Sequence, residues 1–182
     1  MDELDRKTAD EAKKGVRFPV VVVLDNVRSM QNIGSVFRTA DAFNIEAMYL
    51  CGITAQPPHR DIQKTALGAT ESVPWYYHAH TMSAIQSLIS QGYAIYAVEQ
   101  TTKAVSLPKY TFELKKDKVA FVFGNEVDGV DSSILAMCHA AIEIPQWGMK
   151  HSLNISVAAG IVLWEVVRNW SLSVLDDGNN FR

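Results

Sequence analysis

The first candidate site residues lie in a polar loop that follows an apolar segment near the start of this 182-residue chain. Its spacing Asn32-x-Gly34-x-x-x-Arg38 combines an amide, a glycine and a guanidinium. Gly34 allows the backbone to approach a ligand, and a helix N-terminus beside it favours a bound anion. Arg38, one turn further on, would point back at a bound phosphate. The alternative is an ordinary helix cap followed by a surface arginine.

A second loop places a carboxylate between two glycines, in the segment Gly124–Gly129 after an apolar run. A carboxylate in such a position is costly unless it has a partner, and Arg38 or Asn32 would suit Glu126. The alternative is a turn whose Asn, Asp and Gly residues satisfy the backbone. This loop alone is therefore weak support for a site.

A third loop, residues 146–154, leads into a long apolar helix. Ser152 and Asn154 stand at its end, where a hydroxyl and an amide can orient a polar substrate. Either residue would also serve as the helix cap, and capping does not exclude a second role. Neither GxGxxG nor GxxxxGK[ST] accompanies the first loop, so no dinucleotide or nucleoside triphosphate site is indicated.

Strands and helices alternate along the chain, which predicts an α/β domain with a mostly parallel sheet and helices on both faces. The apolar run Val20–Leu24 is typical of a strand that is buried on both faces. The predicted strands span residues 20–24, 47–51, 72–77, 93–98, 119–123 and 140–144. The predicted helices span residues 2–14, 35–43, 62–67, 81–90 with Thr81 as N-cap, 131–137 with Asp131 as cap, and 153–170. Ligands of such sheets bind beyond the carboxyl ends of the strands, so we expect the three loops to outline one site.

The composition is that of a soluble globular protein, with 48% hydrophobic and 20% charged residues. A net charge of −3 and a pI near 5.9 argue mildly against a nucleic-acid partner, unless basic residues gather locally. No apolar stretch approaches the roughly 18–20 residues of a membrane span, and the charged start is not a secretory signal, so we expect a cytoplasmic protein. Cys51 and Cys138 are interpreted as small buried hydrophobes, and the five histidines show no zinc-ligand spacing.

Taken together, the three loops resemble the signature motifs of the SpoU family, the TrmH-like ribose 2′-O-methyltransferase branch of the SPOUT superfamily. The matching segments are Asn32-x-Gly34-x-x-x-Arg38, Phe123-Gly124-x-Glu126-x-x-Gly129, and Ile144-Pro145 followed by Ser152-Leu153-Asn154-Ile155-Ser156. The similarity covers residues 20–170, which leaves a charged extension at 1–19 and a polar tail at 171–182. Gln146 departs from the family, which often has methionine there, and this affects packing of the donor pocket more than its chemistry.

The resemblance implies a deep trefoil knot near the C-terminus, built from the second and third motifs. It also implies a homodimer through the knot and the C-terminal helix, with which the almost wholly apolar helix agrees. S-adenosyl-L-methionine would be the methyl donor, held in the knot without a metal. The donor-binding residues implied by the resemblance are Val98, Glu99, Gln100, Gly124, Ile144, Ser152 and Leu153. The implied catalytic residues are Asn32, Arg38, Glu126, Ser152 and Asn154.

RNA, either tRNA or rRNA, is the implied partner, and a ribose 2′-hydroxyl is the implied acceptor. The candidate RNA-binding residues are Arg28, Arg38, Arg60, Lys64 and Lys150, with His59 and His151 beside them. Each of them alone is as well explained as a solvated surface charge. We interpret Arg38 as an electrostatic clamp rather than a base. The pKa of arginine is about 12 or higher, so its side chain stays protonated at neutral pH. The segment Trp75–Tyr77 could stack on bases, but packing in the core is the favoured interpretation.

Three other functions fit part of the pattern. A non-catalytic knotted RNA-binding protein would not need the full catalytic set, which is present. A knotted enzyme that methylates a base would be distinguished by analysis of the product nucleosides. An α/β enzyme that binds a phosphorylated metabolite at the Gly34 helix terminus would have no affinity for S-adenosylmethionine. The lack of the separate N-terminal RNA-binding domain that some relatives carry slightly favours tRNA as the substrate.

Overall fold

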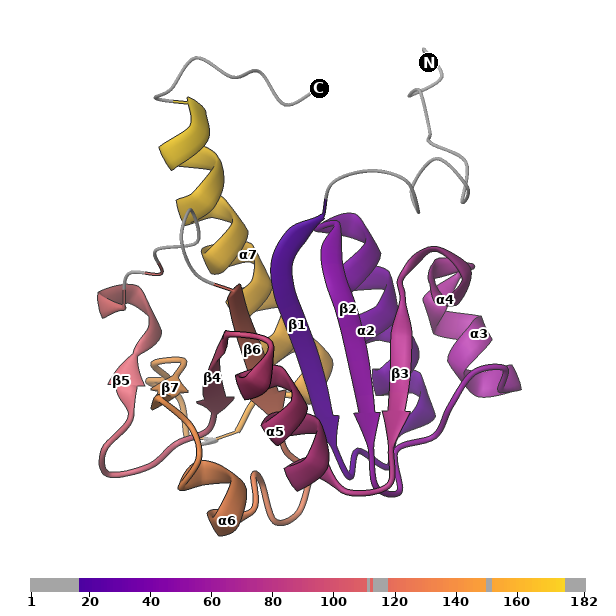
Figure 1. Ribbon diagram of the computed structural model, residues 1–182, viewed down its shortest axis with the longest axis horizontal. Coiled ribbons are helices and arrows are strands. Elements are labelled where there is room, and N and C mark those ends of the chain that lie inside the picture. Colours follow the sequence, from indigo (N-terminus) through magenta and orange to yellow (C-terminus); the bar gives the residue numbers. More distant parts are fainter. Residues whose placement is uncertain (1–16, 111, 113–117, 150–151, 176–182) are drawn as a thin grey trace.

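The computed structural model describes residues 17–110, 112, 118–149 and 152–175, and these contain a seven-stranded sheet (Figure 1). The strands lie in the order β3-β2-β1-β6-β4-β7-β5. Their bounds are β1 Phe18–Asp25, β2 Ile45–Cys51, β3 Trp75–His78, β4 Tyr93–Val98, β5 Val105–Ser106, β6 Lys118–Phe123 and β7 Ala140–Glu143. All six pairings between these strands are parallel, which confirms the predicted mostly parallel sheet.

Helices cover both faces of this sheet, as the alternation of elements predicted (Figure 1). The helices on one face are α2 Met30–Ala42, α3 Arg60–Ala66, α4 Ala69–Ser72 and α7 Ile155–Leu175. The helices on the other face are α5 Thr81–Ser90 and α6 Ser132–Leu135. A short 3-10 helix, Leu107–Lys109, follows β5 on the α7 face.

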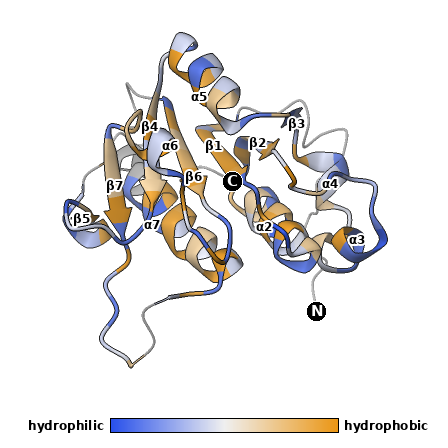
Figure 2. Cartoon of the chain, turned by 90° about the horizontal axis from the view of Figure 1, so that it is seen from below, coloured by the Kyte–Doolittle hydropathy of each residue, from blue (hydrophilic) through white to orange (hydrophobic). Residues whose placement is uncertain are grey.

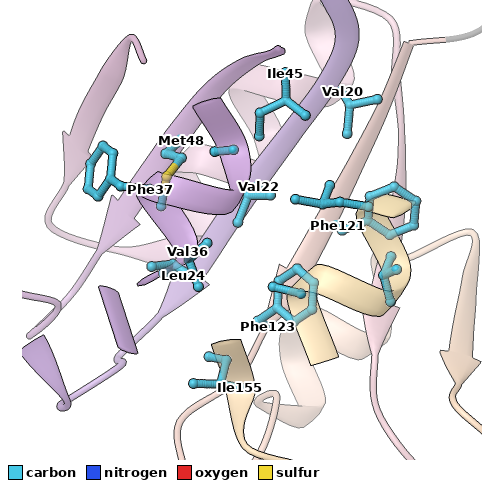
Figure 3. Close-up of a cluster of buried hydrophobic side chains, with 14 of the residues drawn as sticks. Val20, Val22, Leu24, Val36, Phe37, Ile45, Met48, Phe121, Phe123 and Ile155 are labelled. Carbon is cyan, nitrogen blue, oxygen red and sulfur yellow. The ribbon is translucent and has the colours of Figure 1, made fainter. Parts of the chain in front are cut away.

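The central strand β1 contributes to both cores through alternate side chains, because successive residues of a strand point to opposite faces. Val20, Val22 and Leu24 belong to the core under α2 and α7, where Figure 3 shows them with Phe37 and Ile155. The residues between them, Val21 and Val23, belong to the core under α5 and α6. Strands β1 and β6 at the centre of the sheet accordingly appear hydrophobic in Figure 2, and the apolar run of β1 is explained by burial on both faces.

Helix α2 begins five residues earlier than the sequence predicted, at Met30 instead of residue 35. Ser29 is its N-cap, and its Oγ accepts a hydrogen bond from the N–H of Asn32 at 3.3 Å. Gly34 therefore lies inside the helix and not at its N-terminus, and Arg38 lies about two turns in, not one. The predicted helix start was wrong because the polar residues that follow Ser29 are typical of a loop. A serine N-cap nevertheless allows such residues to begin a helix.

Helix α5 has His80 as its N-cap, and not Thr81 as predicted. Thr81 is the first helical residue, and its hydroxyl donates instead to Oδ1 of Asp25 at 2.5 Å. Asp25 is only 2% exposed at the end of β1, and the same oxygen also accepts a hydrogen bond from Asn26. A buried carboxylate requires such donors, and this requirement overrides the local preference of threonine for the cap position.

Three further boundaries differ from the predictions. Ser72 ends α4, so the aromatic strand begins at Trp75. Helix α6 ends at Leu135, two residues early, and α7 extends to Leu175, within the segment expected to be a polar tail. Residues 171–175 contain neither Gly nor Pro, so nothing in them stops the helix. The predicted helix 2–14 lies outside the described residues.

The aromatic strand β3 is at the edge of the sheet and is more exposed than predicted. Tyr76 is 54% and Tyr77 is 43% exposed, so the interpretation of these two residues as core is wrong. Tyr76 packs edge-on against the Tyr49 ring, and the Tyr77 hydroxyl donates to the carbonyl of Gly52 at 3.1 Å. An edge strand lacks a neighbour on one side, which leaves its large side chains partly in solvent.

The two cysteines differ in burial, and burial sets the pKa of their thiols. Cys51 is fully buried in β2, as predicted, whereas Cys138 is only half-buried. Burial raises the pKa of Cys51 to about 12 and that of Cys138 to about 11, so both remain protonated thiols at neutral pH. Among the helices of the described residues, none has the length and apolar character needed to cross a bilayer.

Gly34→Ala is expected to lower the free energy of unfolding by about 1–3 kcal/mol. The added Cβ would lie 2.1 Å from Thr65 Oγ1 and 2.3 Å from the carbonyl oxygen of Ile62, so α3 would have to move away from α2. Urea denaturation measures this loss.

Gly160→Ala in α7 is the matched control. Its Cβ would meet nothing within 4 Å, and alanine should favour the helix by about 1 kcal/mol. Equal stability of the Gly34→Ala variant and the parent protein would contradict the close-packing explanation.

Candidate functional site

A pocket of about 450 Å³ lies at the carboxyl ends of β4, β6 and β7. These strands are neighbours in the sheet, and Val98 at the end of β4 pairs with Phe123 of β6 and Ile142 of β7. The residues that the resemblance assigned to the donor all line this pocket: Val98, Glu99, Gln100, Gly124, Ile144, Ser152 and Leu153. Of the three loops expected to outline one site, the second and third therefore line this pocket, whereas no residue of the first loop is among its lining residues.

The loop after β6 closes on itself and presents Glu126. The N–H of Gly129 donates to the carbonyl of Asn125 at 3.1 Å, and the side chain of Asn125 accepts hydrogen bonds from two N–H groups of the loop. A Cβ at Gly124 would lie 2.0 Å from the carbonyl carbon of Gly129, so the two glycines make this close approach possible.

Glu126 joins this loop to the first motif. Its Oε1 accepts a hydrogen bond from Asn32 Nδ2 at 3.2 Å. The main-chain N–H groups of Arg28 and Ser29 each donate to the same carboxylate at 3.4 Å. Of the two partners predicted for Glu126, Asn32 is therefore present. Arg38 is not among the hydrogen-bond partners of Glu126 in the described part of the chain.

Asn154 connects the third motif to the same network. Its Nδ2 donates to Asn32 Oδ1 at 3.1 Å, so the amide of Asn32 bridges Glu126 and Asn154. The Oδ1 of Asn154 accepts from the N–H of Ser156 at 2.9 Å and from its hydroxyl at 2.7 Å, which caps α7. The helix-cap interpretation of Asn154 is therefore confirmed, and the other end of its amide contacts Asn32.

Hydrogen bonding keeps the Glu126 carboxylate ionised. Burial acts to raise its pKa, but its own N–H, the N–H groups of Arg28 and Ser29 and the Asn32 amide together lower the pKa below the ordinary value. A lowered carboxyl pKa stabilises the folded state above the ordinary pKa, and this stabilisation is lost as the pH falls through the lowered pKa. A carboxylate with so many donors is a weak proton acceptor.

Arg38 is exposed and is not among the residues that line the pocket. It is six positions after Asn32 in α2, which turns it about 120° away around the helix. Because helical side chains lean toward the helix N-terminus, we expect its guanidinium to extend toward the end of α2 that carries Ser29 and Asn32. Ser152, by contrast, is exposed and lines the pocket.

The remaining basic candidates have different surroundings. Arg28 and Arg60 are exposed, whereas Lys64 forms an ion pair with Asp61 at 2.6 Å. His59 is the N-cap of α3, since its Nδ1 accepts a hydrogen bond from the N–H of Asp61 at 3.2 Å. Lys150 and His151 lie outside the described residues. Capping thus provides a structural role for His59 that its sequence context did not reveal.

Sequence reasoning missed several residues that line the pocket, most of which are apolar. The additional lining residues are Phe123, Asn125, Val127, Ile142, Glu143, Ile155 and Ala158. Their adjacency to the motifs was the available signal, but apolar residues at strand ends look like core. The N–H groups of Arg28 and Ser29 were missed as well, because a main-chain donor leaves no mark in the sequence.

The sequence matches the SpoU rRNA methylase family over residues 19–164, a span that includes all three motif loops. The chain belongs to this family. The resemblance of the three motifs is thereby confirmed, and the motif residues that the structure brings together are those of a SpoU protein.

Known relatives of this SpoU chain include RNA methyltransferases. It is 31% identical over 167 residues to the 23S rRNA (guanosine-2′-O-)-methyltransferase RlmB of Vibrio parahaemolyticus, covering 91% of this chain and 66% of the relative. It is 27% identical over 151 residues to the tRNA (guanosine(18)-2′-O)-methyltransferase TARBP1 of Mus musculus, covering 82% of this chain and 9% of that protein. The chain thus spans just under two thirds of the RlmB relative and a small part of TARBP1.

A solved structure has a similar fold. The AdoMet-bound rRNA methyltransferase of Sinorhizobium meliloti matches with a TM-score of 0.77 and 28% identity, over 88% of this SpoU chain and 59% of that chain.

Asn32→Ala is expected to raise the pKa of Glu126 toward its ordinary value, because the carboxylate loses a donor that stabilises its charge. A carbon-detected NMR titration of the glutamate carboxyl groups measures the change. Glu165 is the internal control in the same spectra, since Arg168 and Asn169 lower its pKa in a separate part of the chain. An unchanged Glu126 titration would show that the Asn32 contact is weak.

Proposed function

We propose that this chain transfers a methyl group from S-adenosylmethionine to a ribose 2′-hydroxyl of RNA. The observation that carries the proposal is the single pocket at which the loops of the second and third motifs meet, joined to the first motif through Glu126 and Asn32. The 2′-O-methyltransferase names of the relatives support the same reaction class. Both rRNA and tRNA are named among these relatives, so either is a candidate substrate.

The pocket fits the proposed donor. Its volume of about 450 Å³ is within the range of small-molecule sites. Val98, Ile144 and Leu153 offer apolar side chains for a planar base, and the main chain around Gly124 offers polar groups. S-adenosylmethionine supplies a methyl group on a positively charged sulfur, an electrophile that needs no metal for activation. These residues would hold it beside the network of Asn32 and Asn154.

Residues of the chain itself would prepare the acceptor. Ser152 and Asn154 would orient the ribose, since alignment of two reactants supplies several kcal/mol of rate enhancement, about 7–11 at best. Arg38, which is exposed on α2, would bind the adjacent phosphate and stabilise the developing alkoxide. Glu126 would act as the anchor of Asn32 and not as the base, because its donors lower its pKa. The hydroxyl proton would pass to the phosphate or to solvent.

The start of α2 bears on the rival metabolite-binding function. The N–H groups of Arg28 and Ser29, which a phosphate would use, already donate to Glu126. Because these donors at the helix start already bind the protein's own carboxylate, fewer of them remain for a second anion such as a phosphate. The phosphorylated-metabolite alternative therefore loses the feature on which it was based.

We further propose the knot, the homodimer and a cytoplasmic location that the sequence led us to expect. The knot would involve the loop after β6 and the loop before α7, which share the pocket. A homodimer would cover the exposed apolar residues of α7, namely Val157, Ile161 and Trp164, which are 49%, 37% and 55% exposed.

Trp164→Glu is then expected to shift the mass measured by light scattering from dimer to monomer, because it places a charge in the apolar contact. Glu71→Ala on α4 is the control and should leave the measured mass unchanged.

The test of the proposed reaction uses the pure chain with methyl-labelled S-adenosylmethionine and unmodified tRNA or rRNA, followed by digestion to nucleosides. A labelled 2′-O-methylnucleoside from one RNA class would establish the reaction and the substrate together. Label on a base would retain the fold but replace the chemistry. Absence of donor binding would remove the proposal, whereas donor and RNA binding without transfer would favour a non-catalytic knotted RNA-binding protein.

Arg38→Ala is expected to lower kcat by about 10²–10³-fold, because a cation aimed at developing charge is lost. Affinity for S-adenosylmethionine should change little, since Arg38 does not line the pocket. Steady-state kinetics and donor titration measure the two effects separately. Lys109→Ala, which removes another exposed cation, serves as control, and unchanged turnover in the Arg38 variant would rule out the clamp.

A further inference from the structure

Glu99 connects three segments at the donor pocket. It follows the last residue of β4, and its main-chain N–H donates to the carbonyl of Ile142 in β7 at 3.1 Å. Its side chain reaches the other neighbour of β4: Oε2 accepts from the N–H of Val130, beyond the loop after β6, at 3.0 Å. Oε1 accepts from the N–H of Gln100 at 2.9 Å. Both carboxylate oxygens are thus engaged by main-chain donors.

The loop after β6 has a shape that accommodates this carboxylate. Gly129 adopts a φ of +70°, and a Cβ at this residue would lie 2.2 Å from Glu99 Oε2. Any other residue at position 129 would therefore be strained in its backbone and would collide with the Glu99 side chain. The contact depends on Glu99 to supply the acceptor and on Gly129 to leave space for it.

The loop held by Glu99 is the one that presents Glu126. Its base is fixed where Glu99 bonds Val130, and its tip is fixed where Glu126 bonds Asn32. Between these points the loop is closed by the hydrogen bond from Gly129 N–H to the carbonyl of Asn125. A change at the base is therefore transmitted to the tip, since so short a closed loop has little freedom to absorb it.

We propose that the Glu99 carboxylate is a positioning residue for methyl transfer, which holds the loop after β6 so that Glu126 can fix Asn32 at the pocket. This inference rests on the proposed function. Glu99 acts through Glu126 and not on the reacting atoms, although it is also one of the residues that line the donor pocket. The side chain would thereby couple the donor side of the site to the acceptor side.

The experiment compares the wild-type chain with Glu99→Ala, Glu99→Gln, Glu126→Ala and the Glu99→Ala/Glu126→Ala double variant, with Glu71→Ala as the exposed-carboxylate control. Glu99→Ala should lower kcat about tenfold or more, because it loses hydrogen bonds to a charged group. The KM for RNA should change little. Glu99→Gln retains an oxygen that can accept from Val130 and should recover most of the rate. A role as a charge partner of the cationic donor would not be rescued by glutamine.

The double variant tests the route of the effect. Residues that act as a unit are non-additive, so Glu99→Ala should cost little more once Glu126 is already alanine. The proposal would be overturned if the loss of kcat in the double variant equalled the product of the two single losses. It would also be overturned if Glu99→Ala had the kcat of the wild type. Where Glu99→Ala does not fold, Glu99→Asp takes its place, because its shorter side chain cannot reach Val130 from the same backbone.

Hydrogen exchange separates this inference from the proposed function. The Val130 amide should lose protection in Glu99→Ala and keep it in Glu99→Gln, whether or not the chain methylates RNA. A wild-type chain that methylates no RNA would remove the proposed function. Unchanged Val130 protection in Glu99→Ala would remove the contact on which the inference depends.

Discussion

The arrangement of the site depends on the hydrogen bonds that Glu126 accepts at the start of α2. Glu126 and Asn32 are 94 residues apart in sequence, and they meet because β1 and β6 are adjacent parallel strands whose carboxyl ends lie side by side. The main-chain N–H groups of Arg28 and Ser29 and the Asn32 amide offset the cost of partly burying the carboxylate. The anion that the helix start favours is therefore supplied by the protein itself.

This interaction requires α2 to lie in one position, and packing provides it. Gly34 allows the carbonyl of Ile62 in α3 to approach closely, and Phe37 is fully buried in the core beneath α2. The Ser29 cap then fixes where the helix starts and hence where Asn32 points. Gly34 of the first motif is thus explained by helix packing, whereas Asn32 of the same motif contacts Glu126 and Asn154, which line the pocket.

The sequence predicted the sheet and the meeting of the loops, because both follow from simple periodic rules. Apolar runs such as that of β1 indicate strands buried on both faces, and parallel strands bring their carboxyl ends to one edge. It did not predict the start of α2 or the exposure of Tyr76, because a single serine cap and a place at the sheet edge are decided by tertiary context. The contact between Glu99 and Val130 was also beyond prediction, since its donor is a main-chain N–H that any residue could supply.

Asn154 shows why stability and activity cannot be separated by inspection of one motif. Its amide caps α7 through Ser156 and also donates to Asn32, so substitution by alanine removes both interactions. Loss of a cap costs about 1 kcal/mol of stability, which would leave a stable domain folded, whereas loss of the Asn32 contact disturbs the network that Glu126 anchors. A variant at this position therefore informs on chemistry only when its unfolding free energy is known. The same reasoning favours Asn32, which makes no cap of its own through its side chain, as the clearer probe of the network.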